Sequence, residues 1–196
     1  MIERIKNILI SPKTEWEKIK SEPAGIAQVF TGYAIPLSLI PAVFGFLGLA
    51  VIGVSLGILG SYHIPFGIAL VWGVVYFVLG LVGLYVFALI INALASSFGS
   101  KPDMVKAFKL VVYSMTPAWI AGVLNIFPVI KILVFLASLY GLYILYLGFT
   151  PMMETPKDKV VVYLIVAIVI DIVIFFVIGW ISNLALTLAW RPMLHF

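Results

Sequence analysis

The chain has 196 residues, of which 64% are hydrophobic and 10% are charged, and its mean hydropathy is +1.22. This composition excludes a soluble globular protein, in which about 25% of residues are charged, and indicates a chain embedded in a membrane. The net charge of +4 comes from basic residues that are spread over several loops among acidic ones, so it favours a charged membrane surface over a nucleic-acid partner. The absence of cysteine excludes disulfides and thiolate metal sites.

The first predicted element is an amphipathic cytoplasmic segment over residues 1–28. Its helical pattern breaks at Ser11-Pro12, and a second short helix is predicted to begin at Thr14, because Thr14 and Glu17 fit a capping box. Apolar side chains on one face and lysines on the other are typical of a helix that lies in the headgroup plane. Two interpretations stay open, namely an anchor packed on the membrane bundle and a motif that binds a partner.

Five apolar stretches follow, and each is long enough to cross the hydrocarbon core as a helix. They cover residues 29–53, 66–95, 108–127, 129–149 and 160–185. Together they predict an all-α, polytopic transmembrane helical bundle over residues 29–190, followed by a short outside tail at 191–196.

The distribution of basic residues predicts how the bundle is oriented. Ten of the twelve lysines and arginines lie before the first span, around the connection at 96–107, or in the connection at 150–159. The opposite side holds only Lys131 and Arg191. The positive-inside rule therefore predicts a multi-pass protein of the cytoplasmic (inner) membrane, with its N-terminus in the cytoplasm and its C-terminus outside.

Prolines predict where the spans are distorted or begin. Pro36 and Pro41 each remove a backbone donor from the first span, which is predicted to be kinked or partly unwound. Broken helices can line a substrate or ion site, and prolines also occur in ordinary transmembrane helices, so both interpretations stay open. A further alternative is that this region re-enters as a hairpin, which would place the C-terminus inside. Pro128 is predicted to open the fourth span after a tight hairpin.

Asp171 is the candidate functional residue that the sequence singles out. It lies about 11 residues into the fifth span, which at 1.5 Å per residue is roughly 16 Å deep and near the bilayer midplane. Comparable depth is reached by Tyr85, Thr116, Ser138 and Tyr140, each of which can donate a hydrogen bond. The carboxylate either binds a proton or cation, or stays neutral and hydrogen-bonded among packed helices. The carbonyl of Tyr113, released by Pro117, is a further candidate partner.

Three motifs resemble those of prokaryotic members of the Yip1 family. They are Ser11-Pro12-Lys13-Thr14-Glu15-Trp16, Gly32-Tyr33-Ala34-Ile35-Pro36, and Tyr113-Ser114-Met115-Thr116-Pro117 with its continuation through Pro128 to the aromatic helix at 138–148. The resemblance implies a five-helix integral membrane protein with a cytoplasmic N-terminus. For eukaryotic relatives it also implies vesicle trafficking through prenylated small GTPases, a role that we do not carry over to this chain.

The sequence offers no convincing catalytic constellation. The spans hold one deep carboxylate, no deep histidine and no glycine-rich phosphate loop, so we predict a non-enzymatic protein without cofactor or metal. The first hypothesis is a membrane protein that organises lipids or partners, the latter being further copies or other membrane proteins, and it predicts tight packing around Asp171. The second is a small proton- or cation-linked transporter or channel that uses Asp171, and it predicts a wet cavity there.

Overall fold

The computed structural model describes residues 1–55, 61–127 and 130–190, and most of this part is helical. Within it, five helical runs are long and apolar enough to cross a membrane. They are Ile26–Ile52, Phe66–Phe98, Met104–Ile126, Ile132–Met153 and Val160–Leu188. The predicted all-α bundle of five spans is therefore confirmed, with boundaries that differ by a few residues.

Two short helices, α1 (Ile2–Ile10) and α2 (Pro12–Ser21), precede the spans. The first span consists of α3 (Ile26–Val29), the π-helical turn η1 (Phe30–Ala34), α4 (Ile35–Leu47) and a second π-helical turn, η2 (Gly48–Ile52). Strand β1 (Val54–Ser55) pairs antiparallel with β2 (Ser61–Tyr62) before the second span, which comprises α5 (Phe66–Leu94) and η4 (Ala95–Phe98). The third span comprises α6 (Met104–Ser114), α7 (Thr116–Ala121) and η5 (Gly122–Ile126), and it is followed by α8 (Lys131–Met153) and α9 (Val160–Trp190).

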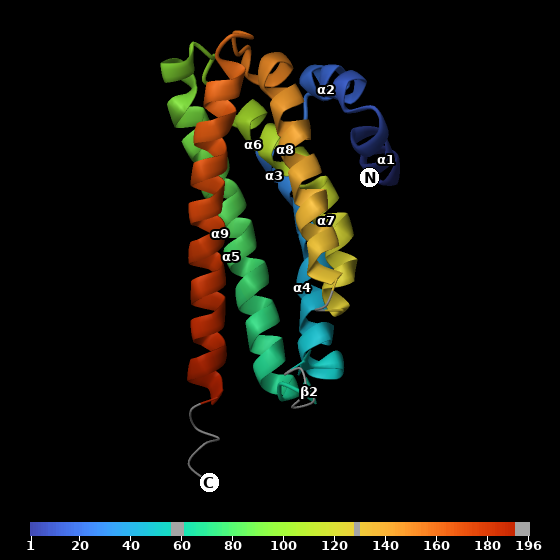
Figure 1. The fold of residues 1–196 in the computed structure, drawn as a ribbon. Helices are drawn as coiled ribbons and strands as arrows, with labels where there is room; N and C mark the ends of the chain where they lie inside the picture. The colour runs from blue at the N-terminus through green and yellow to red at the C-terminus, as the bar shows by residue number, and fades with distance from the viewer. Residues whose placement is uncertain (56–60, 128–129, 191–196) are drawn as a thin grey trace.

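The two N-terminal helices and the end of α9 lie at opposite ends of the bundle (Figure 1). Helix α9 packs mainly along α5, whereas α4, α7 and α8 form the other side of the bundle. The tightest packing is at the end that carries α1 and α2. The largest fully buried side chains there include Trp16, Phe108, Phe149 and Tyr163.

The first span is widened by a π-helical turn before Pro36 and is not unwound there. The π-helical turn η1 ends just before Pro36, and the amide of Ile35 donates to the carbonyl of Phe30, five residues back. Pro36 then occupies the first turn of α4, and Pro41 lies inside that helix. A π turn accommodates the irregularity within a continuous helix. The run from Ile26 to Ile52 is uninterrupted, so the re-entrant alternative is wrong.

The second N-terminal helix begins earlier than predicted. Helix α2 starts at Pro12, with Ser11 at the N-cap position and no hydrogen bond from the Ser11 side chain. Proline suits a first helical turn because its missing amide would have no intrahelical partner there. The predicted start at Thr14 is therefore wrong, because Pro12 opens the helix instead of ending the previous segment.

Gly141 marks the closest approach of α8 to the end of α6. A Cβ at Gly141 would lie 2.7 Å from the carbonyl oxygen of Ser114, whereas a Cβ at Gly179 of α9 would meet nothing within 4 Å. We expect Gly141→Ala to lower the melting temperature, since overpacking costs about 1–3 kcal/mol and outweighs the gain in helix propensity of about 1 kcal/mol. The matched Gly179→Ala variant should keep or raise the melting temperature. Equal effects of the two variants would contradict this account of the α6–α8 contact.

Candidate functional site

Helices α1 and α2 form a cap, defined here as residues 1–22, that packs on α8 and α6. The side chains of Ile8 and Trp16 are fully buried. The indole Nε1 of Trp16 donates to the carbonyl of Ile144 at 3.1 Å, and the hydroxyl of Tyr140 donates to the carbonyl of Leu9 at 2.7 Å. The cap is therefore attached to α8 by hydrogen bonds from both sides of the contact.

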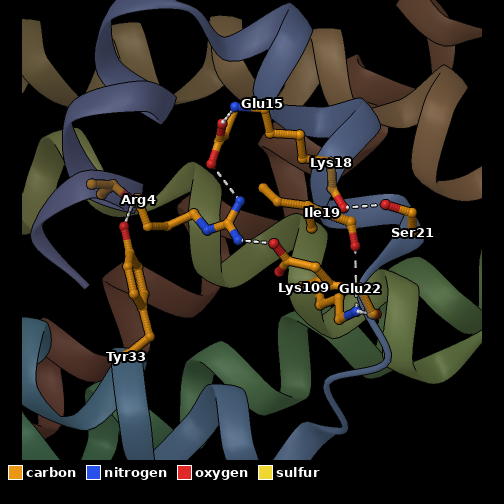
Figure 2. A network of polar contacts seen from close by, with 9 residues as sticks. Arg4, Glu15, Lys18, Ile19, Ser21, Glu22, Tyr33 and Lys109 are labelled. Atoms are coloured by element: carbon orange, nitrogen blue, oxygen red, sulfur yellow. Dashed lines mark hydrogen bonds and ion pairs between the residues drawn. The ribbon is translucent and has the colours of Figure 1, made fainter.

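Arg4 holds the cap together from within. Its guanidinium donates to the carboxylates of Glu15 and Glu22 (Figure 2). The guanidinium also lies over the ring of Tyr113, at 5.5 Å from the ring centroid. Burial by itself lowers the pKa of Arg4, but the hydrogen bond and attraction of Glu22, joined by Glu15, outweigh it and raise the pKa above its ordinary value. The guanidinium thus stays charged and connects α1 to both ends of α2.

Lys109 of α6 anchors the C-terminal end of α2. Its side chain is buried, and its Nζ donates to the carbonyl of Glu22 at 2.6 Å and to that of Ile19 at 3.4 Å (Figure 2). The last carbonyls of a helix lack intrahelical partners, and a cation there also interacts favourably with the helix dipole. From the sequence, Lys109 was counted only among the ten basic residues that predict the orientation, at the start of the third span. Its position among the apolar residues Phe108 and Leu110 was the signal that it faces the protein.

The break between α6 and α7 is closed by a short relay of hydroxyls. Thr116 is fully buried, and its Oγ1 donates to the carbonyl of Tyr113 at 2.7 Å. The hydroxyl of Tyr33 lies 2.8 Å from the same Oγ1 and must donate to it, because the Thr116 proton is already used. Pro117 lies in the first turn of α7. The Tyr113 carbonyl thus bonds Thr116 and not Asp171.

A cavity of about 180 Å³ lies between α4, α5, α7, α8 and α9, and Asp171 lines it. Its other polar lining residues are Ser38, Tyr76, Asn125 and Ser138. The hydroxyls of Ser38 and Ser138 donate to carbonyls of their own helices, at Ile35 and Val134. In the part of the chain that the structure describes, the Asp171 carboxylate has no hydrogen bond or ion pair. The tight packing that the organising hypothesis predicted around Asp171 is therefore not what the structure has.

Of the four residues predicted to share the depth of Asp171, Ser138 alone lines the same cavity. Tyr85 is 41% exposed and packs against Phe108, on a different face of α5. Thr116 belongs to the hydroxyl relay, and Tyr140 bonds the cap. Ser38, Tyr76 and Asn125 also line this cavity and were not predicted to do so. Pro128 lies outside the described residues, so its place at the start of the fourth span stays a prediction.

A family model for the Yip1 domain matches residues 6–179 of the chain. This chain belongs to the Yip1 family. Two relatives, each called inner membrane protein YohC and found in Escherichia coli K12 and Escherichia coli O6:H1, are 22% identical to it over 151 residues. Each match covers 76% of this chain and 77% of the relative. No solved structure matches the chain.

The Yip1 match begins within α1 and ends within α9, so it includes residues 6–22 of the cap, the α6–α7 break and the cavity. The resemblance inferred from the motifs is confirmed. In this Yip1 protein the Ser11–Trp16 motif opens α2 and carries the buried indole, while Tyr113 and Pro117 flank the break in the third span. The relatives are called inner membrane proteins, and the described residues of this chain include five helices that could cross a membrane. Both observations agree with a multi-pass membrane protein.

Proposed function

We propose that this Yip1-family protein is a non-enzymatic membrane protein that organises anionic lipids around its cytoplasmic end. The observation that carries the proposal is the docked cap. Trp16 and Ile19 are fully buried against the bundle, whereas Lys13 and Lys20 of the same helix are exposed. A docked helix holds its lysines at a fixed place near the headgroups, where each basic residue gains about 1 kcal/mol from an anionic leaflet.

Loops at the same end add further positive charge. Lys101 follows the second span, and Lys157 and Lys159 lie between α8 and α9, where all three are exposed. These loops and the cap share one end of the bundle (Figure 1). The concentration of lysines supports an N-terminus in the cytoplasm and a C-terminus outside. The exposed apolar side of α9, which includes Phe176 and Trp180, would then face lipid chains, further copies or other membrane proteins.

Lipid enrichment tests the proposal directly. The protein would be placed in nanodiscs of phosphatidylethanolamine with a minor share of phosphatidylglycerol, and the lipids retained on extraction would be counted by native mass spectrometry. We expect phosphatidylglycerol to exceed its bulk share, and the excess to fall with salt because exposed charges are screened. A variant with Lys13, Lys20, Lys157 and Lys159 changed to glutamine should lose the excess, whereas the same four changes to arginine should keep it. Equal enrichment in the glutamine variant would refute the proposal.

The competing proposal is proton- or cation-linked transport through Asp171, and the cavity is the observation in its favour. Proton and monovalent-cation flux in proteoliposomes separates the two functions. The organising function expects flux no greater than that of empty liposomes. Flux that is present in the wild type and absent in Asp171→Asn would favour transport.

A further inference from the structure

The cavity beside Asp171 plays no part in organising lipids at the surface. We propose that this cavity binds a small hydrophobic amine, whose ammonium group pairs with the Asp171 carboxylate while its apolar body fills the rest of the space. The inference goes beyond the proposed function, because neither the cap nor the exposed lysines border the cavity.

The carboxylate calls for a positive partner. Asp171 is half-buried. Its position along the fifth span is predicted to place it near the bilayer midplane, where an unpaired charge is costly. Among the described residues, the lining of the cavity includes no lysine, arginine or histidine. A cationic ligand would supply the missing charge.

The remaining lining suits an organic cation. Tyr76, Phe77, Phe87 and Trp119 border the same cavity as Asp171. An ammonium group is attracted to the faces of aromatic rings as well as to a carboxylate, and an apolar pocket with a few polar groups is typical of small-molecule sites. An apolar cavity of about 150 Å³ is known to hold benzene. A cavity of about 180 Å³ therefore suits an amine of roughly one ring in size.

The same lining disfavours two other classes of ligand. A hard metal ion takes about six or more oxygen ligands, and the described residues contain no group of three acidic, histidine or cysteine side chains that could hold a metal. A phospholipid headgroup would bring a phosphate, which needs basic side chains or backbone amides as partners. The described lining provides a carboxylate and no basic side chain, so the ligand carries an amine without a phosphate.

Fluorine NMR with 4-fluorobenzylamine tests the proposal on the full chain in nanodiscs, with empty nanodiscs as the baseline for partitioning into lipid. We expect saturable binding that unlabelled benzylamine competes away and that benzyl alcohol, its neutral isostere, does not. The Asp171→Asn variant should bind at least about tenfold more weakly, because it removes the charge and keeps the shape. The matched control is Asp158→Asn, which changes an exposed loop carboxylate and should bind as the wild type does.

A second variant keeps the test decisive if Asp171→Asn does not fold. Ser138→Leu fills part of the cavity from α8 and leaves the carboxylate in place, and it should also abolish saturable binding. Helical content from circular dichroism would confirm that each variant is folded. The proposal is overturned if the wild type shows no saturable binding above empty nanodiscs, if Asp171→Asn binds as tightly as the wild type, or if benzyl alcohol competes as well as benzylamine. Lipid enrichment is measured separately, so either proposal can fail alone.

Discussion

Replacing Trp16 with alanine is expected to release the cap from the bundle. The indole is fully buried and donates a hydrogen bond to Ile144 of α8. It also packs closely on α8, where a Cβ at Gly148 would lie only 2.7 Å from the indole ring, and it meets the ring of Tyr113 edge-on at 6.3 Å. Truncation of a buried tryptophan to alanine typically lowers stability by about 3–5 kcal/mol. We expect a loss of this size to undock the cap.

Limited proteolysis measures this release. Trypsin cleaves after Lys13, Lys18 and Lys20, whose side chains are exposed but whose backbone is helical in α2, so we expect cleavage to require that the docked helix opens. If docking of the cap is weakened by about 3 kcal/mol, the fraction of molecules with an undocked cap rises more than a hundredfold. The rate of cleavage is proportional to that fraction when undocking and redocking are fast relative to cleavage. The control is Glu17→Ala, an exposed position on the same helix, which should leave the cleavage rate nearly unchanged. Equal rates in the two variants would show that Trp16 does not hold the cap.

The second large effect is expected from Arg4→Met, which keeps much of the side-chain length and removes the charge. The Glu15 side chain is only 4% exposed and would then be left with Lys18 at 3.6 Å as its remaining ion pair. Breaking a buried ion pair by removing one partner costs about 3–5 kcal/mol. The Glu22 side chain is 37% exposed and can be hydrated again once Arg4 is removed. We therefore expect Arg4→Met to lower the free energy of unfolding by about 2–3 kcal/mol, less than for a fully buried pair.

Chemical unfolding and tryptic cleavage of the cap would both measure the stability that Arg4→Met loses. The raised pKa of Arg4 contributes stability that is fully present below the pKa of an unfolded arginine and is lost only as the pH rises through the folded value. The contribution of Arg4 ionisation is therefore constant from pH 6 to pH 9. Adding Glu15→Gln to Arg4→Met should recover part of the stability, since it removes the stranded charge. Additive losses in the double variant would contradict an Arg4–Glu15 pair.

The number and length of the spans were predictable because bilayer thickness fixes how long an apolar helix must be. The second and fifth spans were predicted to begin at 66 and 160, and helices α5 and α9 start at those residues. The distortion near Pro36 was also predictable, because a missing backbone donor has to be accommodated locally. Its form as a π-helical turn was not, because that choice depends on how the neighbouring helices pack.

The partners of Asp171 were not predictable by counting residues. Depth along a helix follows from the rise per residue, but the direction in which a side chain points depends on how each helix is rotated in the bundle. Tyr85 has a suitable depth and points elsewhere, whereas Ser138 has the same depth and points into the cavity. The roles of Arg4 and Lys109 depend on contacts between distant segments, which helical periodicity within one segment does not reveal.

The contacts of the cap also impose an order on how the protein is made. Trp16 and Ile144 are 128 residues apart, and Leu9 and Tyr140 are 131 apart. At a synthesis rate of about 5–20 residues per second, the surface on which the cap docks leaves the ribosome on the order of ten seconds after the cap itself. During that interval the apolar side chains of Ile8 and Trp16 lack their partners, and an amphipathic helix in this condition adheres to the membrane interface. Helices α1 and α2 are thus translated well before the surface on which they reach their native position.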